Sequence, residues 1–343
     1  MEQTFIDRGA VYELHHEQTL PTIIQAKPEE PGTKAPLNLT AWSSENRAYL
    51  ESALVKSGAI LFRGFAMRSP QDLEELVSSL TPQMLNYIEG SSPRMRLTEK
   101  VYTSTEYPPE FAISLHNELS YAHAWPARLF FLCLTAPLEG GETPLADSQR
   151  IYQMLDRTIL EPFLKNGVKY VRNLHGGKRG VGLSWQTVFE TDDRAWVERY
   201  CEEGKIEYEW TKRGGLRTSQ IRPAAIKHPV TGTPVWFNQA DQWHPTNLPE
   251  SVRASMLALI SEKDLSINAY YGDGSPLKPA VLDEIRHVFE LATVKLPWQK
   301  GDVLLVDNTR IAHGRCPFTG PRKVVLAMGG LVHLSDVEIV TGR

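Results

Sequence analysis

Cysteine is scarce in this chain. Its 343 residues include three cysteines, Cys133, Cys201 and Cys316, and no two of them are close in the sequence. An odd and widely spaced set fits neither a disulfide framework nor a structural zinc site, because both need grouped cysteines. We therefore expect the protein to work in a reducing compartment.

Long apolar runs and an excess of positive charge are also absent. No stretch approaches the roughly 20 apolar residues of a membrane-spanning helix, and the N-terminal stretch MEQTFIDRGAVYELHHEQ is charged throughout, unlike a secretory signal. The formal net charge is −4, whereas nucleic acids and anionic membranes attract basic proteins. These absences predict a cytoplasmic protein that binds neither nucleic acid nor membrane.

What is present is an ordinary globular composition, with 41% hydrophobic and 23% charged residues. A chain of this length can bury a sizeable core without disulfides. No linker, repeat or low-complexity tract interrupts it, so we expect a single domain over residues 1–343. Pro, Lys and Glu are frequent between residues 21 and 40, and we expect about residues 1–37 to form a poorly packed lead-in.

Short strand signals bounded by turns occur toward both ends of the chain and in its middle. Residues 128–135, RLFFLCLT, are apolar on both faces and should lie in the centre of a sheet. Other strands are expected over 58–62, 113–121, 168–173, 303–307 and 323–333, and helices over 41–56, 69–80, 148–165, 192–203 and 249–262. No βαβ alternation is evident. The pattern predicts a mainly β protein with flanking helices, built as a sandwich or barrel.

The sharpest local motif is Leu115-His116-Asn117-Glu118. On a strand, residues two apart point to the same face, so His116 and Glu118 would present an imidazole and a carboxylate side by side. The tripeptide H-x-E alone is weak, because it occurs often by chance on a solvated strand face. A second imidazole is available from His313, which follows an apolar strand and a polar turn.

Two histidines and one carboxylate make the facial triad of non-haem Fe(II) oxygenases. Three protein ligands leave three positions open on the metal, which suit a bidentate 2-oxo acid and O₂. The same ligand types also occur at catalytic zinc sites, so a zinc hydrolase is an alternative that the residues alone leave open.

Seven segments together resemble a known family. The sequence is similar to the iron- and 2-oxoglutarate-dependent dioxygenases of the taurine dioxygenase (TauD/TfdA) and clavaminate synthase-like superfamily, and among them to enzymes of nonribosomal peptide pathways that β-hydroxylate aspartate or related amino acids. The resemblance is carried by GAILFRGF (58–65), TSTEYP (103–108), LHNELSY (115–121), GGETPLAD (140–147), HPVTGTPVWFNQ (228–239), YYGDG (270–274) and GDVLLVDNTRIAHGRCPFTGPR (301–322). It implies a double-stranded β-helix, or jelly-roll, core.

The resemblance also assigns roles to residues. His116, Glu118 and His313 match the iron ligands, and Thr143 matches the threonine that hydrogen-bonds the cosubstrate. Many relatives have Asp in place of Glu118, although the clavaminate synthase-like branch also uses Glu. The retained carboxylate favours hydroxylation, desaturation or ring closure over halogenation.

The arginine that pairs with the distal carboxylate of 2-oxoglutarate is best matched by Arg322. A planar guanidinium suits that role because it can hold a carboxylate with two hydrogen bonds. Arg315 and Lys323 are competing candidates, since the spacing from the distal histidine varies among relatives. The gap between Glu118 and His313 is long for the superfamily, which predicts an insertion over about residues 175–275 that covers the site.

Substrate contacts are expected from residues near these motifs. The amides of Asn238 and Gln239 could orient a substrate or satisfy buried backbone groups, and Arg94 could pair with a substrate carboxylate or be exposed. The full set of candidates is Glu106, Asn117, Asn238, Gln239 and Arg94.

The resemblance implies the cofactors Fe(II), 2-oxoglutarate and O₂, and a small amino-acid-like substrate that is either free or tethered to a carrier protein. An acidic carrier could dock on a local basic stretch, although such a stretch is usually a solvated face; it comprises Lys205, Lys212, Arg213, Arg217, Arg222 and Lys227. The expected activity is hydroxylation of an unactivated C–H bond in secondary metabolism. A desaturase or cyclase of the same family, and a jelly-roll binding module without catalysis, are the alternatives.

Overall fold

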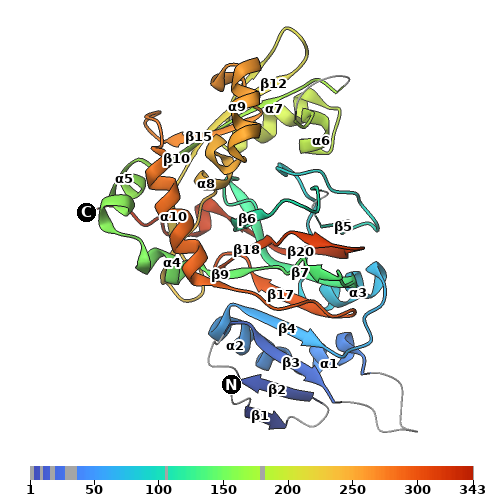
Figure 1. Ribbon diagram of the computed structural model, residues 1–343. Coiled ribbons are helices and arrows are strands. Elements are labelled where there is room, and N and C mark those ends of the chain that lie inside the picture. The colour runs from blue at the N-terminus through green and yellow to red at the C-terminus, as the bar shows by residue number, and fades with distance from the viewer. Residues whose placement is uncertain are drawn as a thin grey trace.

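Two β-sheets with a shared apolar core form the centre of the molecule (Figure 1). The computed structural model describes residues 4–7, 11–15, 20–27, 37–104, 107–177 and 182–342, the first two ranges as backbone only. The order of strands in the larger sheet is β1 (Thr4–Asp7), β2 (Val11–His15), β3 (Thr22–Ala26), β4 (Ala59–Arg63), β17 (Val303–Asp307), β7 (Ala124–Thr135), β20 (Lys323–His333) and β5 (Val101–Thr103). The smaller sheet has the order β16 (Thr293–Val294), β9 (Leu145–Asp147), β18 (Ile311–Arg315) and β6 (Ile113–His116).

Strand β7 lies between β17 and β20, which confirms the central place that its apolar sequence predicted. Its side chains alternate between two cores: Leu129 and Phe131 face the smaller sheet, whereas Phe130 and Leu132 pack with the helices on the other face. Both faces of the strand are therefore buried, as an apolar run without polar alternation requires. The expected mainly β architecture with a jelly-roll core is confirmed.

Helices cover the outer face of the larger sheet and one end of the sandwich. The larger sheet is covered by α1 (Leu39–Glu45), α2 (Arg47–Ser57) and α3 (Pro70–Leu80), and further helices are α4 (Ser148–Met154), α5 (Arg157–Asn166) and α10 (Pro279–Ala292). The single helix expected over 41–56 is divided at Asn46, whose backbone and side-chain N–H groups both bond the carbonyl of Trp42 and end the first helix. Ser69 caps α3 as its sequence predicted.

Residues 22–26 correct two expectations. They are not part of a poorly packed lead-in, because Ile23 and Ile24 are buried and β3 pairs with β4 across four residues. That pairing is parallel, with α1 and α2 in the connection, so one βαβ unit exists where none was expected. The apolar pair Ile23-Ile24 supplies the reason, since the chain buries it by adding a strand to the sheet.

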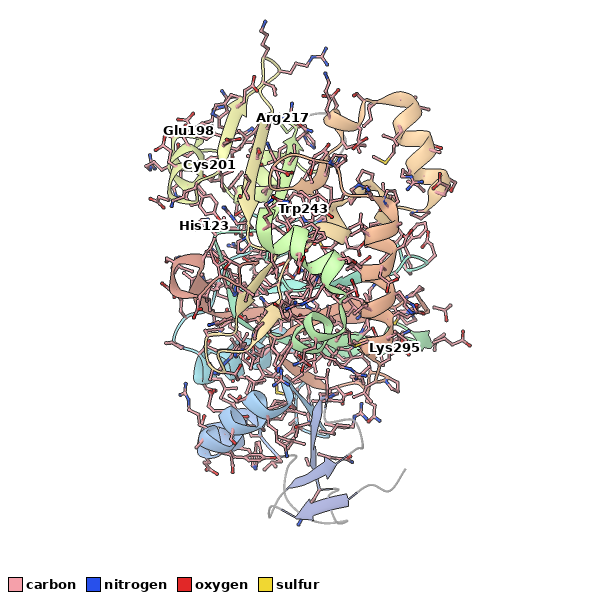
Figure 2. All side chains as sticks on the ribbon, turned by 90° about the vertical axis from the view of Figure 1, so that its left-hand side faces the viewer. His123, Glu198, Cys201, Arg217, Trp243 and Lys295 are labelled. Carbon is pink, nitrogen blue, oxygen red and sulfur yellow. The ribbon has the colours of Figure 1, made fainter. Side chains whose placement is uncertain are left out.

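The segment predicted as an insertion contributes most of a separate four-stranded sheet, hereafter the insertion sheet. Its strand order is β11 (Glu207–Trp210), β12 (Leu216–Arg222), β10 (Val168–Leu174) and β15 (Ile267–Tyr271). Helices α6 (Trp185–Phe189), α7 (Arg194–Glu203), α8 (Ala240–Trp243) and α9 (Glu250–Leu259) accompany it. Its own apolar cluster includes Trp185, Phe189 and Cys201. In Figure 2 the labels of Cys201, Glu198 and Arg217 mark this part of the molecule.

Short elements complete the chain. These are two strand pairs, β13 (Ala225–Lys227) with β14 (Pro234–Trp236) and β8 (Glu139–Gly140) with β19 (Phe318–Thr319), and the 3₁₀ turns η1 (Pro245–Asn247), η2 (Glu262–Asp264) and η3 (Leu334–Asp336). Among the described residues, no helix is both long and apolar enough to span a bilayer.

Candidate metal centre

The two histidines of the predicted triad meet because their strands pair. His116 is the last residue of β6, and His313 is its antiparallel partner in the middle of β18. The two imidazole rings lie with their centroids 4.6 Å apart. Strand pairing therefore brings together two side chains that are far apart in the sequence.

Glu118 lies close to the two histidines, but it is not on the strand that the sequence predicted. Strand β6 ends at His116, so His116 and Glu118 are not alternate residues of one strand. Glu118 instead lies in a turn that continues through Leu119, a residue with a positive φ of 59°. The side chain of Asn308 fixes this turn: its Oδ1 accepts from the Glu118 backbone N–H at 2.7 Å, and its Nδ2 donates to the Glu118 carbonyl at 2.9 Å.

The donor set fits a metal ion. One potential ligand atom from each of His116, Glu118 and His313 lies within 4.8 Å of the others, and all three side chains are buried. His313 Nε2 and Glu118 Oε2 are 4.0 Å apart, which is too far for a hydrogen bond and close enough to share one ion. Two imidazoles and one carboxylate match the preference of ferrous iron in this kind of site.

Both imidazoles are held in the neutral form that a metal ligand needs. Burial lowers the pKa of His116, and burial together with the neighbouring His116 and Arg94 holds the pKa of His313 well below its usual range. His116 Nδ1 lies 2.8 Å from the carbonyl of Ser114, so that nitrogen carries the proton and Nε2 is left for a metal. The amide Nε2 of Gln242, from α8, lies 3.1 Å from the same Nδ1.

Arg94 lies at the triad, and its side chain is 4% exposed rather than solvated. Its Nη2 donates to Glu118 Oε2 at 2.7 Å, and the Glu118 side chain is 2% exposed. Burial alone would lower the pKa of Arg94, because it favours the neutral form. The charge of Glu118 outweighs this effect and raises the pKa of Arg94 above its usual range. Arg94 Nε and Nη1 have no hydrogen-bond partner among the described residues.

A pocket of about 390 Å³ opens beside the triad and is lined by most of the predicted site. Its walls are Arg94, Ser104, Ile113, His116, Phe131, Thr143, His313, Gly314, Arg315 and Arg322. Three arginines, Arg94, Arg315 and Arg322, in one partly enclosed pocket make it suitable for an anion. The structure therefore places the predicted cosubstrate residues Thr143, Arg322 and Arg315 next to the predicted metal ligands.

Arg315 and Arg322, two of the three arginines of this pocket, have different surroundings. Arg315 donates to three backbone carbonyls, those of Tyr107, Pro108 and Phe111, at 2.6–2.8 Å, and so holds that loop. Arg322 donates to the carbonyl of Gly141 and to Ser104 Oγ. Burial and the neighbouring Arg315 lower the pKa of Arg322 to about 10, so it is still charged at neutral pH. Lys323, the other competing candidate, is exposed.

Three of the expected substrate residues have other roles in the structure. Asn117 Nδ2 donates to the carbonyl of Asn308, Asn238 Nδ2 donates to the carbonyl of Ala224, and Gln239 Nε2 donates to the carbonyl of Asn117. These amides satisfy buried backbone carbonyls, and a contact with the substrate stays a prediction. Glu106, another expected contact, lies outside the described residues.

The basic stretch also needs correction. Arg222 is 4% exposed and donates to the carbonyls of Tyr121 and Gly204, while Lys227 pairs with Glu338 at 2.5 Å. These residues therefore do not form one continuous solvated face, and the predicted docking surface for an acidic carrier loses two of its members.

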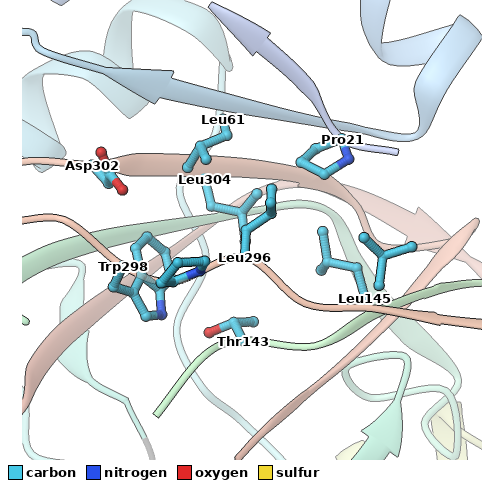
Figure 3. A pocket seen from close by; sticks show the side chains of 10 residues that line it. Pro21, Leu61, Thr143, Leu145, Leu296, Trp298, Asp302 and Leu304 are labelled. Atoms are coloured by element: carbon cyan, nitrogen blue, oxygen red, sulfur yellow. The ribbon is translucent and has the colours of Figure 1, made fainter. Parts of the chain in front are cut away.

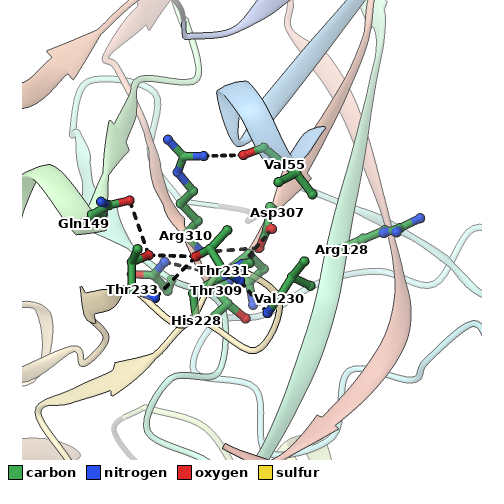
Figure 4. Close-up of polar contacts among 12 residues, drawn as sticks. Val55, Arg128, Gln149, His228, Val230, Thr231, Thr233, Asp307, Thr309 and Arg310 are labelled. Atoms are coloured by element: carbon green, nitrogen blue, oxygen red, sulfur yellow. Dashed lines mark hydrogen bonds and ion pairs between the residues drawn. The ribbon is translucent and has the colours of Figure 1, made fainter. Parts of the chain in front are cut away.

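Asn308 and Gln242 were not predicted as site residues. Asn308 stands inside the quoted motif DNTRIAHGR, directly after an apolar strand, and that position was the available signal. The next residue toward the strand, Asp307, is anchored in turn: its Oδ2 lies 2.9 Å from His228 Nε2, and its Oδ1 accepts from the Thr309 backbone N–H (Figure 4). This network fixes the turn that carries Asn308. Gln242 has no comparable motif around it.

A second cavity, of about 310 Å³, lies on the other side of Thr143. Its walls are mostly apolar and include Leu61, Leu145 and Leu304, with Trp298 at one end (Figure 3). The Nε1 of Trp298 has no hydrogen-bond partner among the described residues. Thr143 is the side chain that the two cavities have in common.

The sequence matches the profile of the family described as taurine catabolism dioxygenase TauD, TfdA family, over residues 24–328. The matched range contains the triad and all three pocket arginines.

Two curated proteins are similar over most of their length. The dapdiamide synthesis protein DdaC of Enterobacter agglomerans is 40% identical over 289 residues, which is 84% of this chain and 87% of that protein. A clavaminate synthase-like protein of Arabidopsis thaliana is 32% identical over 310 residues, 87% of this chain and 89% of that protein.

Solved structures show the same fold at low identity. PvcB of Pseudomonas aeruginosa, described as an Fe, alpha-ketoglutarate dependent oxygenase from an isonitrile synthetic pathway, aligns with a TM-score of 0.55 at 14% identity. The alignment covers 99% of this chain and 97% of PvcB. From the profile match, the curated relatives and the fold together, the chain belongs to the TauD/TfdA family and is an iron- and 2-oxoglutarate-dependent dioxygenase.

Proposed function

We propose that this enzyme hydroxylates an unactivated C–H bond of an amino acid, free or tethered to a carrier protein, in the biosynthesis of a secondary metabolite. The observation that carries the proposal is the buried group His116, Glu118 and His313, beside a pocket lined by three arginines. The names of DdaC, for dapdiamide synthesis, and of PvcB, for an isonitrile pathway, are consistent with biosynthetic chemistry. The three free cysteines favour a reducing compartment such as the cytoplasm.

His116, Glu118 and His313 would hold the iron through His116 Nε2, one imidazole nitrogen of His313 and a Glu118 oxygen. Bound ferrous iron supplies the activation of O₂ that is coupled to decarboxylation of 2-oxoglutarate and to transfer of an oxygen atom to the substrate. The protein contributes neutral imidazoles, a fixed carboxylate and a buried setting. Asn308 keeps Glu118 in place, and burial of all three ligands limits the access of water.

Thr143 and Arg322 would bind 2-oxoglutarate. Arg322 provides the charge for the distal carboxylate, and the carbonyl of Gly141 and Ser104 Oγ hold its guanidinium in place. Thr143 supplies a hydroxyl on the same wall of the pocket. Arg315 is better suited to hold the 107–111 loop, because both of its Nη groups already donate to loop carbonyls.

Arg94 would take part in substrate binding. A guanidinium has five N–H donors, and in Arg94 the Nε and Nη1 groups have no partner among the described residues. A buried cation with free donors favours a substrate that brings a carboxylate to the pocket. Replacing a substrate carboxylate by a carboxamide should therefore weaken binding more strongly in the wild type than in Arg94→Met.

Two other functions remain as alternatives. A desaturase or cyclase would use the same triad, and its product would lose two hydrogen atoms instead of gaining one oxygen atom. A metal-free binding module would have no reason to keep three buried potential ligands together, and the buried ion pair of Arg94 and Glu118 beside them also argues against it.

The test is a screen for succinate release. The enzyme is loaded with Fe(II) under anaerobic conditions and then mixed with 2-oxoglutarate, O₂ and either free amino acids or carrier-loaded aminoacyl thioesters. Succinate is quantified, and the masses of the products are determined by mass spectrometry. The proposal expects succinate and a product with one added oxygen atom. Succinate with a product that has lost two hydrogen atoms would favour the desaturase or cyclase, and no succinate in any mixture would contradict the proposal.

A further inference from the structure

We infer that Glu89 is a positioning residue, through which the insertion sheet holds Arg94 against Glu118. The inference rests on the proposed metal site at the triad and adds a connection between that site and a distant part of the chain. Glu89 lies five residues before Arg94, between α3 and β5, and it is 4% exposed.

The backbone of Glu89 is held in an unusual conformation. Its φ is 65°, a left-handed value that is uncommon for a residue other than glycine and persists only when the surroundings impose it. The Glu89 N–H donates to the carbonyl of Val188 at 2.8 Å. The Glu89 carbonyl accepts from Tyr121 Oη at 2.7 Å and from Arg172 Nη1 at 3.2 Å.

The carboxylate of Glu89 is bonded to the insertion sheet and its helix. Tyr200 of α7 donates to Glu89 Oε2 at 3.0 Å, and Gln220 of β12 donates to Glu89 Oε1 at 2.8 Å. Burial, followed by the charge of Glu89, raises the pKa of Tyr200 well above its usual range, so its hydroxyl remains a donor. In both bonds the donor comes from the insertion sheet or its helix α7, and the acceptor is the carboxylate of Glu89.

Residues 87–94 transmit the position of Glu89 to Arg94. The guanidinium of Arg94 lies over the ring of Tyr87, 4.1 Å from its centroid, and the Tyr87 hydroxyl lies 3.2 Å from Ser92 Oγ. The segment folds tightly around this ring, because a Cβ at Gly90 would lie 2.1 Å from an atom of Tyr87. Because residues 87–94 are tightly packed, a displacement of Glu89 should also displace Arg94.

The far end of this connection is the ion pair at the triad. Arg94 Nη2 and Glu118 Oε2 are 2.7 Å apart, with both side chains almost fully buried. A metal-binding carboxylate depends on the partners that fix its orientation. When the bonds of Glu89 are removed, Arg94 should lose its fixed position, and Glu118 should hold the metal less well.

The test changes one functional group at a time in the contact between Glu89 and Tyr200. In Tyr200→Phe the donor to Glu89 is lost without a change of shape, and in Glu89→Gln the charge is lost with the same chain length. The measured quantity is the dissociation constant of Fe(II) in the presence of 2-oxoglutarate, from anaerobic titration of the visible absorption of the complex. We expect an increase on the order of 10-fold for either variant, in the range typical of residues that orient metal ligands.

Tyr208→Phe is the matched control, because Tyr208 lies on β11 of the same sheet and its hydroxyl bonds Glu202 instead of Glu89. It should leave the dissociation constant unchanged. An equal increase in Tyr208→Phe, or no increase in Tyr200→Phe and Glu89→Gln, would overturn the inference.

A double-mutant cycle separates positioning from general stability. If Glu89 acts through Arg94, Tyr200→Phe should weaken Fe(II) binding in the wild type and have almost no further effect in Arg94→Met. If Tyr200→Phe raised the dissociation constant of Fe(II) by the same factor with and without Arg94→Met, the proposed action of Glu89 through Arg94 would be contradicted. Urea unfolding of each variant shows whether a loss of global stability accompanies the change.

Hydrogen exchange provides a readout that does not depend on iron. The backbone amides of residues 87–92 and of Arg94 should exchange slowly in the wild type and in Tyr208→Phe, and faster in Tyr200→Phe. Unchanged exchange in Tyr200→Phe would overturn the positioning role. If the wild type bound no Fe(II) at all, the proposed function would fail, whereas this exchange experiment would still decide whether the insertion holds the segment.

Discussion

The side-chain amide of Asn308 pairs with the backbone of Glu118 through both of its polar groups. Its oxygen accepts from the Glu118 N–H at 2.7 Å, and its nitrogen donates to the Glu118 carbonyl at 2.9 Å. Asn308 Nδ2 also donates to the carbonyl of Pro126 on β7. One buried amide therefore attaches the turn that carries Glu118, a predicted metal ligand, to strand β7 of the larger sheet.

Asn308→Asp should weaken iron binding, because a carboxylate cannot donate to the carbonyls of Glu118 and Pro126. We expect the dissociation constant of Fe(II) to rise by about 10–100-fold. Anaerobic titration with Fe(II) and 2-oxoglutarate measures it. Asn46→Asp, at the junction of α1 and α2, is a control for the same change of residue type, and an equal effect in both variants would contradict the role given to Asn308.

Arg322→Met and Arg315→Met should have different effects. Loss of Arg322 removes the charge for the distal carboxylate, so the KM for 2-oxoglutarate should rise by about 100-fold, as for loss of a charge-assisted bond of 2–3 kcal/mol. Loss of Arg315 leaves three loop carbonyls without a donor and should mainly lower the melting temperature. Steady-state kinetics and thermal unfolding separate the two, and the reverse pattern would make Arg315 the cosubstrate ligand.

His313→Ala and Glu118→Ala should abolish product formation while the fold is kept. Each variant removes one of three protein ligands, and neither side chain belongs to the apolar cores. Because Glu118→Ala leaves Arg94 buried without its partner, Glu118→Gln is a second variant that keeps an acceptor for the guanidinium. Circular dichroism and succinate release are measured together, and a folded variant with wild-type turnover would show that the ligand assignment is wrong.

Asp241→Asn should change how stability depends on pH. Burial raises the pKa of Asp241 to about 6, from the usual 3.8, despite the nearby Arg286. The folded state therefore binds a proton that the unfolded state has released between these values, and this contribution is full below pH 3.8 and lost as the pH rises through 6.

The free energy of unfolding of the wild type, relative to Asp241→Asn, should thus fall by on the order of 2–3 kcal/mol between pH 4 and pH 7. Urea unfolding at several pH values measures the difference. A difference that is constant over this range would contradict the raised pKa.

The sequence was sufficient for the jelly-roll architecture, and it singled out three potential metal ligands that the structure brings together. Residues 129–134 are all apolar, and such a run is typical of a strand that is buried on both faces. His116 and His313 were found by their motifs. His116 was expected on a strand, whereas His313 was expected after a strand and a polar turn; the structure instead places His313 on β18, paired with His116.

Other parts of the site depend on contacts that no local pattern encodes. The H-x-E spacing suggested one continuous strand, whereas Glu118 lies in a turn that Asn308 holds from a residue far away in the sequence. Asn238 and Gln239 look like substrate ligands beside aromatic residues, but they bond buried carbonyls. Residues 22–26 appeared loosely packed from their composition, although two isoleucines place them in the sheet.

The central claim is that His116, Glu118 and His313 hold one ferrous ion. Anomalous diffraction at the iron absorption edge, from crystals grown anaerobically with Fe(II) and 2-oxoglutarate, tests it most directly. The account predicts one strong peak within bonding distance of all three side chains, with 2-oxoglutarate extending from it toward Arg322. A peak elsewhere in the molecule, or a peak bonded to only one of the three, would contradict it.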